Sequence, residues 1–217
     1  MKNTIAVIWG TPTDTLFWKQ LLLSLGYKKI GECAVAKSPQ EQNYLQQQPS
    51  TILQQKCLQI CKKFKNQWYK RVLIYCNSLS SVIDIKILEK ESSISIVSPI
   101  QVYEDIRKRY KHICVIAANS SGTSLAEKEL SRNSESHIIT FWFLELVEKI
   151  ETSLPPGRIC KDMGLEKITQ FAEINNSEVI LLSCTHFPYI KEELQKYTYL
   201  PILDLDTGLK KILSWKE

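Results

Sequence analysis

Residues 179–186 have the sequence Val-Ile-Leu-Leu-Ser-Cys-Thr-His, an apolar run that ends at Cys184. Residues 72–78, Val-Leu-Ile-Tyr-Cys-Asn-Ser, repeat this form, and their apolar run ends at Cys76. Short apolar runs of this kind are typical of buried strands. Small hydroxyl or amide residues follow each cysteine, and a helical pattern comes next. We therefore expect each thiol where a strand ends and a helix begins, a position that can lower a thiol pKa and favour the thiolate.

The two cysteines lie about half of the 217-residue chain apart, as two similar halves would place them. Segments whose apolar residues recur with helical periodicity lie between most of the apolar, β-rich runs. This alternation predicts mostly parallel sheets with helices on both faces. Folds of this class bind ligands at the carboxyl ends of their strands. The apolar runs occur at residues 4–9, 29–36, 71–76, 93–97, 112–118, 137–143, 179–184 and 201–205.

These observations predict an α/β fold with two pseudo-symmetric lobes, each a mostly parallel sheet flanked by helices, and an active site in the cleft between them. Ser98-Pro99 follows a strand and restarts the pattern, so a lobe boundary is expected there. The last segment is expected to return to the first lobe. The expected lobes are therefore residues 1–97 with 200–217, and residues 98–199. The glutamine-rich segment 37–50 is interpreted as a polar loop or a helix lead-in.

Composition favours a globular protein of the cytoplasm. Hydrophobic residues make up 44% and charged residues 24% of the chain, which is ordinary for soluble domains. No apolar run approaches the roughly 20 residues that span a bilayer, and the first apolar stretch is too short for a signal peptide. The seven cysteines form no CxxC pair, which favours free thiols in a reducing compartment.

The net charge of +5 does not indicate a nucleic-acid partner. The lysines are scattered, and their densest group, within residues 62–71, borders the end of a predicted helix. Cations suit the macrodipole at that end. Nucleic-acid binding would need a concentrated basic face, so we expect a small-molecule partner, with no nucleic acid and no membrane.

The residues around Cys184 permit proton transfer. His186 lies two residues after the thiol and could orient it or exchange its proton. Pro188 suits the first turn of a helix, whose N–H groups could hold a substrate carboxylate. A matched pair of thiols at equivalent strand ends could remove a proton from one face of a carbon and return it on the other.

Tyr-Cys-Asn-Ser at 75–78 and Ser-Cys-Thr-His-Phe-Pro at 183–188 resemble the paired cysteine motifs of the aspartate/glutamate racemases, a cofactor-independent superfamily. The likeness covers nearly the whole chain in order and spacing. It implies that Cys76 and Cys184 act as opposing acid and base, with His186 beside them. It also implies a substrate-binding set, completed by a hydroxyl from the loop at 118–123. That set comprises Asn77, Ser78, Thr185 and, from the loop, Ser121 or Ser120.

The chain departs from the superfamily after its first strand. Glutamate racemases have Asp-Ser-Gly there and aspartate racemases a Gly-Gly-Met-Gly-Pro turn, whereas this chain has Trp9-Gly10-Thr11-Pro12. Gly10 and Thr11 are expected to bind substrate through backbone and hydroxyl groups. Trp9 either lines the substrate pocket or packs in the core. The Pro-Tyr-Gly turn of glutamate racemases is absent from residues 37–48, so the choice between aspartate and glutamate stays open.

We therefore expect a homodimeric racemase of an acidic amino acid, with a two-cysteine mechanism and neither cofactor nor metal. Another racemase of the superfamily, such as a hydantoin racemase, is an alternative. A non-catalytic relative that binds a metabolite or a protein is another. Trp9 argues for that last alternative, and the two intact cysteines argue against it. Zinc at Cys76, Cys184 and His186 would lack an evident further ligand. Cys57 and Cys61, four residues apart on a helix, are interpreted as core.

Overall fold

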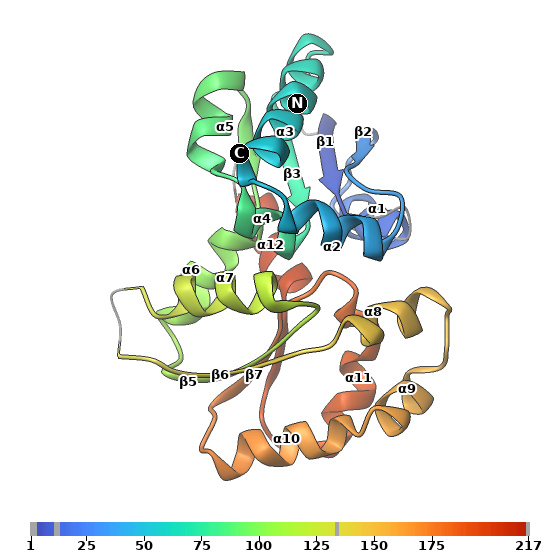
Figure 1. Cartoon of the computed structure of the whole chain (residues 1–217), viewed down its shortest axis with the longest axis vertical. Helices are drawn as coiled ribbons and strands as arrows, with labels where there is room; N and C mark the ends of the chain where they lie inside the picture. Colours follow the sequence, from blue (N-terminus) through green and yellow to red (C-terminus); the bar gives the residue numbers. More distant parts are fainter. Residues whose placement is uncertain (1–3, 11–13, 133–134, 216–217) are drawn as a thin grey trace. The chain divides into compact units, whose positions relative to one another are not determined.

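The computed structural model describes residues 4–10, 14–132 and 135–215 (Figure 1). The chain divides into two compact units. Unit 1 is Met1–Gln101 with Leu209–Glu217, and unit 2 is Val102–Gly208. Each unit contains one four-stranded sheet in which every paired strand is parallel, with helices around it. The predicted α/β class, with two lobes each built on a parallel sheet, is therefore confirmed.

The sheet of unit 1 has the strand order β2-β1-β3-β4. Its strands are β1 (Thr4–Trp9), β2 (Lys29–Ala34), β3 (Arg71–Tyr75) and β4 (Ser95–Val97). The helices within this unit are α1 (Asp14–Ser24), α2 (Pro39–Gln47), α3 (Ser50–Asn66), α4 (Asn77–Val82) and α5 (Ile85–Ser92). Two further helices cross the boundaries between the units, α6 (Pro99–Arg107) and α12 (Leu205–Trp215).

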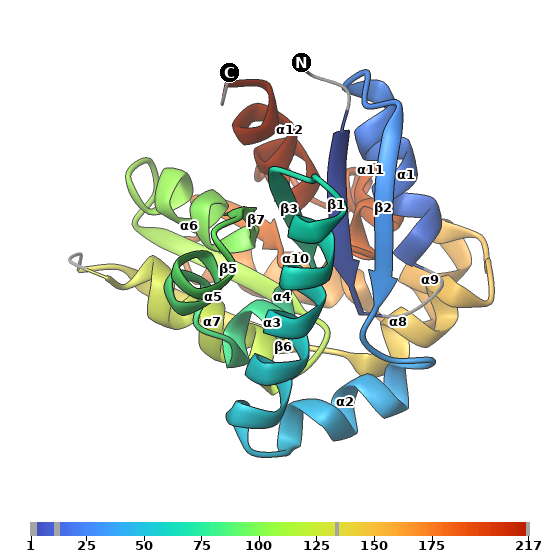
Figure 2. The same ribbon diagram turned by 90° about the horizontal axis from the view of Figure 1, so that it is seen from above.

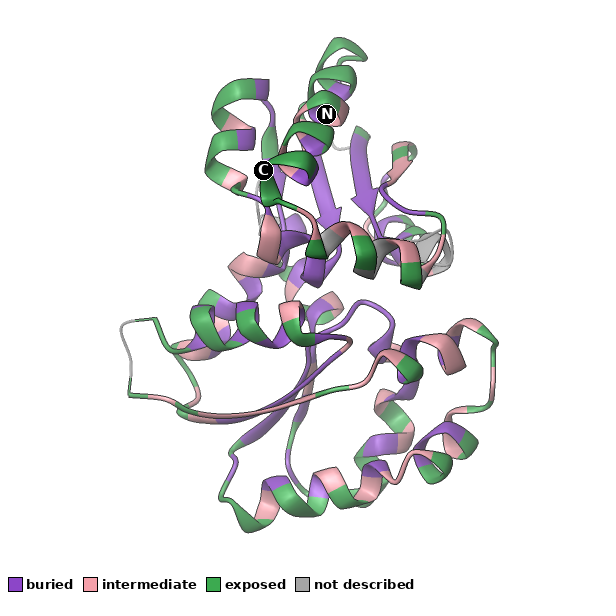
Figure 3. Cartoon of the chain, viewed as in Figure 1, coloured by how far each residue is buried: buried purple, intermediate pink, exposed green. Residues whose placement is uncertain are grey.

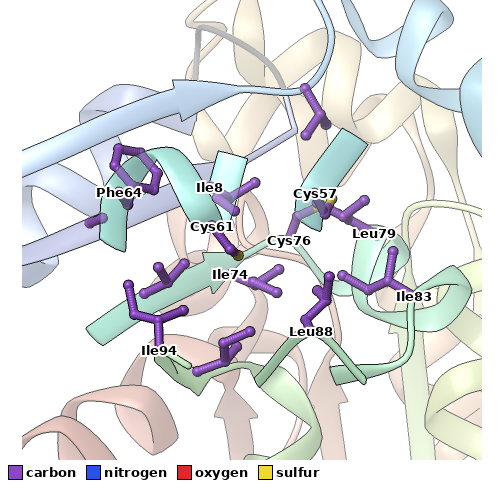
Figure 4. Packing of buried hydrophobic residues seen from close by; sticks show 14 of the residues in the cluster. Ile8, Cys57, Cys61, Phe64, Ile74, Cys76, Leu79, Ile83, Leu88 and Ile94 are labelled. Carbon is purple, nitrogen blue, oxygen red and sulfur yellow. The ribbon is translucent and has the colours of Figure 1, made fainter. Parts of the chain in front are cut away.

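The central strands β1 and β3 of the first sheet are buried on both faces, as their continuous apolar runs require. On one face Ile8 and Ile74 pack with Cys57 and Cys61 of α3 (Figure 4). Successive side chains of a strand point to opposite faces, so Trp9 lies on the other face from Ile8. That face meets α1, where the ring centroid of Trp9 is 5.1 Å from that of Trp18.

The sheet of unit 2 has the strand order β6-β5-β7-β8, and Figure 2 labels its strands β5, β6 and β7. Its strands are β5 (His112–Ala117), β6 (His137–Trp142), β7 (Val179–Leu182) and β8 (Ile202–Asp204). Its α-helices are α7 (Ser120–Leu130), α8 (Leu144–Glu151), α9 (Pro156–Asp162), α10 (Leu165–Ile174) and α11 (Lys191–Leu194). Two 3₁₀ turns complete it, η1 (Phe187–Ile190) and η2 (Gln195–Tyr197). The two central strands, β5 and β7, are nearly fully buried, whereas the edge strand β6 is not (Figure 3).

The two sheets share one topology. In each, the strands are arranged in the order second, first, third, fourth of their unit. The direction of winding reverses between the first and third strands, which are neighbours. In open α/β sheets, ligands bind outside the carboxyl ends of the strands at this switch point. The switch points here lie between β1 and β3 in unit 1, and between β5 and β7 in unit 2.

Two segments differ in detail from the sequence-based expectations. The glutamine-rich segment contains a complete helix, α2, because Ser38 caps it by accepting the N–H of Glu41 and the Glu41 carboxylate accepts the N–H of Lys37. The second boundary also differs in position from the expected one. β8 hydrogen-bonds to β7, with Ile202 opposite Ile180, so the chain returns to unit 1 only at Leu209.

Candidate functional site

The first group of candidate residues, called here the Cys76 group, follows β1 and β3 in unit 1. Cys76 comes directly after β3 and caps α4, because its sulfur accepts the N–H of Leu79 at 3.4 Å. The same sulfur is 3.6 Å from the hydroxyl oxygen of Ser78. Asn77 and Ser78 form the first turn of α4, and both are buried. The strand end therefore gathers a thiol, an amide and a hydroxyl within three consecutive residues.

Trp9 and Gly10 belong to the same edge of the first sheet. Trp9 stands opposite Tyr75 in the parallel register, so β1 and β3 end side by side. Gly10 is buried and its carbonyl accepts the N–H of Ala36 at 3.0 Å. The Trp9 side chain is 6% exposed, and its indole N–H has no hydrogen-bond partner in the described part of the chain. Thr11 lies outside the described residues.

The second group, called here the Cys184 group, follows β5 and β7 in unit 2. Cys184 lies two residues beyond β7 and is 7% exposed. Its sulfur is 3.8 Å from Nδ1 of His186, whose Nε2 is 3.1 Å from Oε1 of Glu151 at the end of α8. All three side chains are at least four-fifths buried. The structure thus joins the two predicted residues to a carboxylate that sequence reasoning missed.

The order of these three groups sets the proton positions on the imidazole. A carboxylate can only accept, so Glu151 favours the His186 tautomer that carries its proton on Nε2. Nδ1 is then an acceptor directed at the sulfur of Cys184. This arrangement can take a proton from the thiol and return it.

Ser120 and Ser121 start α7, directly beyond β5. Asn119 caps this helix by accepting the N–H of Gly122 at 3.0 Å. Leu182 pairs with Ile116 in the register, so β5 and β7 end at the same edge. Ser120 is exposed and Ser121 is half-buried. Thr185, the remaining residue of the group, is buried beside His186.

An ion pair stands beside the end of β7. Asp204 ends β8 opposite Leu182, and its carboxylate accepts from the Lys191 ammonium at 2.6 Å and from the backbone N–H of Thr207 at 2.7 Å. Burial alone would raise the pKa of Asp204. The hydrogen bonds from Lys191 and Thr207 more than offset this, and they hold the pKa below its usual value.

Four other cysteines are fully buried core residues, and this burial raises the pKa of each thiol and keeps it neutral. The pKa rises to about 12 for Cys57, Cys61 and Cys114, and to about 11 for Cys160. Within residues 4–10, 14–132 and 135–215, no three His, Cys, Asp or Glu side chains gather in a way that could hold a metal ion. No helix in these ranges combines the length and apolar character of a membrane span.

Comparison of sequences finds glutamate racemases. The relative from Histophilus somni is 28% identical over 144 residues, which cover 64% of this chain and 53% of the relative. The relative from Buchnera aphidicola is 32% identical over 148 residues, which cover 64% of this chain and 56% of the relative. The chain therefore spans about half the length of the curated relatives it matches. No family model matches the chain.

Comparison of structures finds glutamate racemases and proteins related to aspartate racemases. Glutamate racemase from Francisella tularensis, solved with D-glutamate, matches with a TM-score of 0.74 and 19% identity, over 98% of this chain and 80% of that chain. An aspartate racemase homologue from Pyrococcus horikoshii matches with a TM-score of 0.71 and 17% identity, over 98% and 97% of the two chains. The chain is thus similar in sequence to glutamate racemases and similar in fold to glutamate racemases and an aspartate racemase homologue. The likeness to these solved structures concerns the fold alone.

Proposed function

We propose that this protein interconverts the enantiomers of aspartate or glutamate, with Cys76 and Cys184 as its two proton-transfer groups and with no cofactor. The observation that carries the proposal is the chain of contacts from the Cys184 sulfur through His186 to Glu151, at the switch point of the second sheet. The repeated topology supports an equivalent role for Cys76, which follows the third strand of its own unit. The names of the relatives support an acidic amino acid as substrate.

The reaction is balanced in protons and electrons. One cysteine, as thiolate, takes the α-proton, and the electron pair of the C–H bond stays on the α-carbon. The other cysteine, as thiol, gives its proton to the opposite face of that carbon and becomes a thiolate. The mechanism therefore requires the two sulfur atoms to reach opposite faces of one substrate, and each positioned acid or base contributes about 10²–10⁴-fold to the rate.

The side chains near each thiol have separate proposed tasks. His186 accepts the proton of Cys184 and returns it, while Glu151 holds the imidazole in the required tautomer. Hydroxyl and amide groups bind the substrate and disperse the negative charge that develops on it. The proposed binding residues are Trp9, Gly10, Thr11, Asn77, Ser78, Ser120, Ser121 and Thr185.

Proton exchange in D₂O tests this proposal directly. The purified protein is incubated with each enantiomer of aspartate and glutamate, and separately with a 5-substituted hydantoin, and the α-proton signal is followed by NMR. Exchange from both enantiomers of one amino acid, with conversion between them, is expected. Exchange only with a hydantoin would favour another racemase of the superfamily. Calorimetric binding of an amino acid without any exchange would contradict catalysis and indicate a non-catalytic relative.

A further inference from the structure

A buried pair of hydroxyl groups includes Ser183, the residue that precedes Cys184 in the chain. The phenol oxygen of Tyr103, on α6, is 2.6 Å from the hydroxyl oxygen of Ser183. Tyr103 is fully buried and Ser183 is 1% exposed. A distance of 2.6 Å is at the short end for hydroxyl pairs, and such bonds are stronger in a buried, low-dielectric setting. The two residues are 80 positions apart in the chain, so only the fold brings them together.

Ser183 is the residue that attaches Cys184 to the sheet. Its N–H donates to the carbonyl of Ile116 in β5 at 2.7 Å, and its side chain meets Tyr103 on α6. The backbone immediately before Cys184 is therefore held from two separate elements. A rotation of this residue would change the direction of the thiol relative to Nδ1 of His186.

The position of Tyr103 is itself restricted. The preceding residue, Val102, lies against Gly208 of α12, where an added Cβ would come within 2.4 Å of a Val102 methyl carbon. The backbone of Gly208 is thus in tight contact with the side chain of Val102, next to Tyr103. A packed interior of this kind does not deform freely. The phenol hydroxyl is consequently presented to Ser183 from a fixed point.

We propose that Tyr103 is a positioning residue for Cys184, acting through Ser183. The inference rests on the proposed function, because it assigns Tyr103 to one of the two proton-transfer groups. In this role Tyr103 acts through Ser183 and takes no part in the proton transfer itself. Loss of its hydroxyl should therefore disturb proton transfer by Cys184 and leave proton transfer by Cys76 intact. A residue that only stabilised the fold would affect both.

The test compares α-proton exchange from the two enantiomers in D₂O. Cys184→Ser first identifies the enantiomer whose exchange depends on that thiol. Tyr103→Phe is then expected to slow this exchange about 10- to 100-fold, the range for small misplacement of a catalytic group, with less than a twofold change for the other enantiomer. Tyr27→Phe is the matched control, because Tyr27 is also a buried tyrosine, and its hydroxyl meets Arg71 at the far end of the first sheet.

Ser183→Ala supplies a second, smaller variant. It should reproduce the direction-specific loss, and the double variant Tyr103→Phe/Ser183→Ala should be no slower than Ser183→Ala, since the two residues act in one chain of contacts. Circular dichroism and thermal melting establish that each variant is folded. Equal slowing from both enantiomers, or unchanged exchange in folded variants, would overturn the inference.

A readout that does not use catalysis separates this inference from the proposed function. The alkylation rates of Cys184 and Cys76 by iodoacetamide are measured by mass spectrometry in the wild type and in Tyr103→Phe. A change at Cys184 of about threefold or more, with Cys76 unchanged, supports the positioning role. If the wild type exchanges no amino acid, the proposed function fails, and the alkylation ratio still decides the role of Tyr103. Equal ratios in both proteins would refute it.

Discussion

Cys76 and Cys184 occupy the same place in two sheets of the same topology, yet their surroundings differ in chemistry. The sulfur of Cys76 meets a backbone N–H and lies near a hydroxyl, both from the helix that follows it. The sulfur of Cys184 faces an imidazole that a carboxylate from a distant helix orients. The fold thus repeats the position of a thiol, and these contacts of the two sulfur atoms differ in chemistry.

The residues that end the strands next to each cysteine also differ in chemistry between the two units. Trp9 ends the strand next to Cys76, and its ring packs on Trp18. Asp204 ends a strand next to Cys184, and its carboxylate binds Lys191. An aromatic pair therefore supports one strand end, and an ion pair supports the other. We therefore expect substitutions at these strand ends to affect stability and proton exchange differently in the two units.

The largest effect is expected from the cysteines themselves. Cys76→Ser should slow α-proton exchange from one enantiomer about 10²–10⁴-fold, and Cys184→Ser should do the same for the other, because each thiol serves one face of the substrate. NMR in D₂O measures both rates. Cys33→Ser, at a partly exposed thiol, is the control and should change neither rate. If both variants exchanged the α-proton of both enantiomers at the wild-type rate, the proposed two-cysteine mechanism would be contradicted.

Trp9→Gly tests what the aromatic pair contributes in unit 1. Removal of a large buried side chain should lower the free energy of unfolding by about 3–5 kcal/mol, measured in urea. Trp68→Gly is the control, because Trp68 is 89% exposed with φ of +67°, a conformation that glycine adopts easily. A broadened substrate range in Trp9→Gly would assign the ring to the substrate pocket. An unchanged range with the expected loss of stability would restrict it to packing.

Asp204→Asn tests the ion pair in unit 2. The pKa of Asp204 is held low in the folded state, so its contribution is complete above the pKa of the unfolded state, about 4, and is lost as the pH falls through the folded value. The variant should lose about 1.5–3 kcal/mol in the free energy of unfolding at pH 7. The difference from wild type should shrink as the pH falls below 4.

Urea titrations at several pH values measure this dependence. Glu104→Gln removes an exposed ion pair with Lys108 and is the control, with an expected change of about 0.5 kcal/mol or less. A difference between Asp204→Asn and wild type that stays constant down to pH 2 would exclude charge as the cause.

Glu151→Gln is expected to give the smallest effect and to sharpen the comparison most. The amide can no longer enforce the Nε2-protonated tautomer of His186, so proton exchange through Cys184 should slow about tenfold, at the lower end for general acid–base groups. Exchange through Cys76 should not change. Glu145→Gln, on the same helix and mostly exposed, is the matched control. Equal slowing from both enantiomers would show that Glu151 does not act on Cys184 specifically.

The strands and the cysteines were predictable because their signals are local. Each strand is a short apolar run, and each of the eight runs expected from the sequence contains a strand of the structure. The places of Cys76 and Cys184 after β3 and β7 follow from the same local pattern. The start of α2 after its N-cap residue, Ser38, also has a local signal, because Glu41 follows this serine three residues later.

The partners of the cysteines were not predictable, because they depend on packing between distant segments. Glu151 is 35 residues from His186, and it is an ordinary residue at the end of an amphipathic helix until α8 is placed against the loop after β7. Tyr103 and Ser183 are separated further. The second unit boundary depends on the pairing of β8 with β7, and an apolar run alone does not state which sheet it joins.

The division of the chain has a consequence for the order in which the protein is made. Unit 2 is one continuous segment, Val102–Gly208, whereas unit 1 receives its last residues, Leu209–Glu217, only after unit 2 is complete. A ribosome adds residues from the amino terminus at about 5–20 per second. Most of unit 1 is therefore synthesised before unit 2, but unit 1 becomes complete only after unit 2. Nascent unit 1 therefore lacks Leu209–Glu217 during the whole time in which residues 102–208 of unit 2 are synthesised.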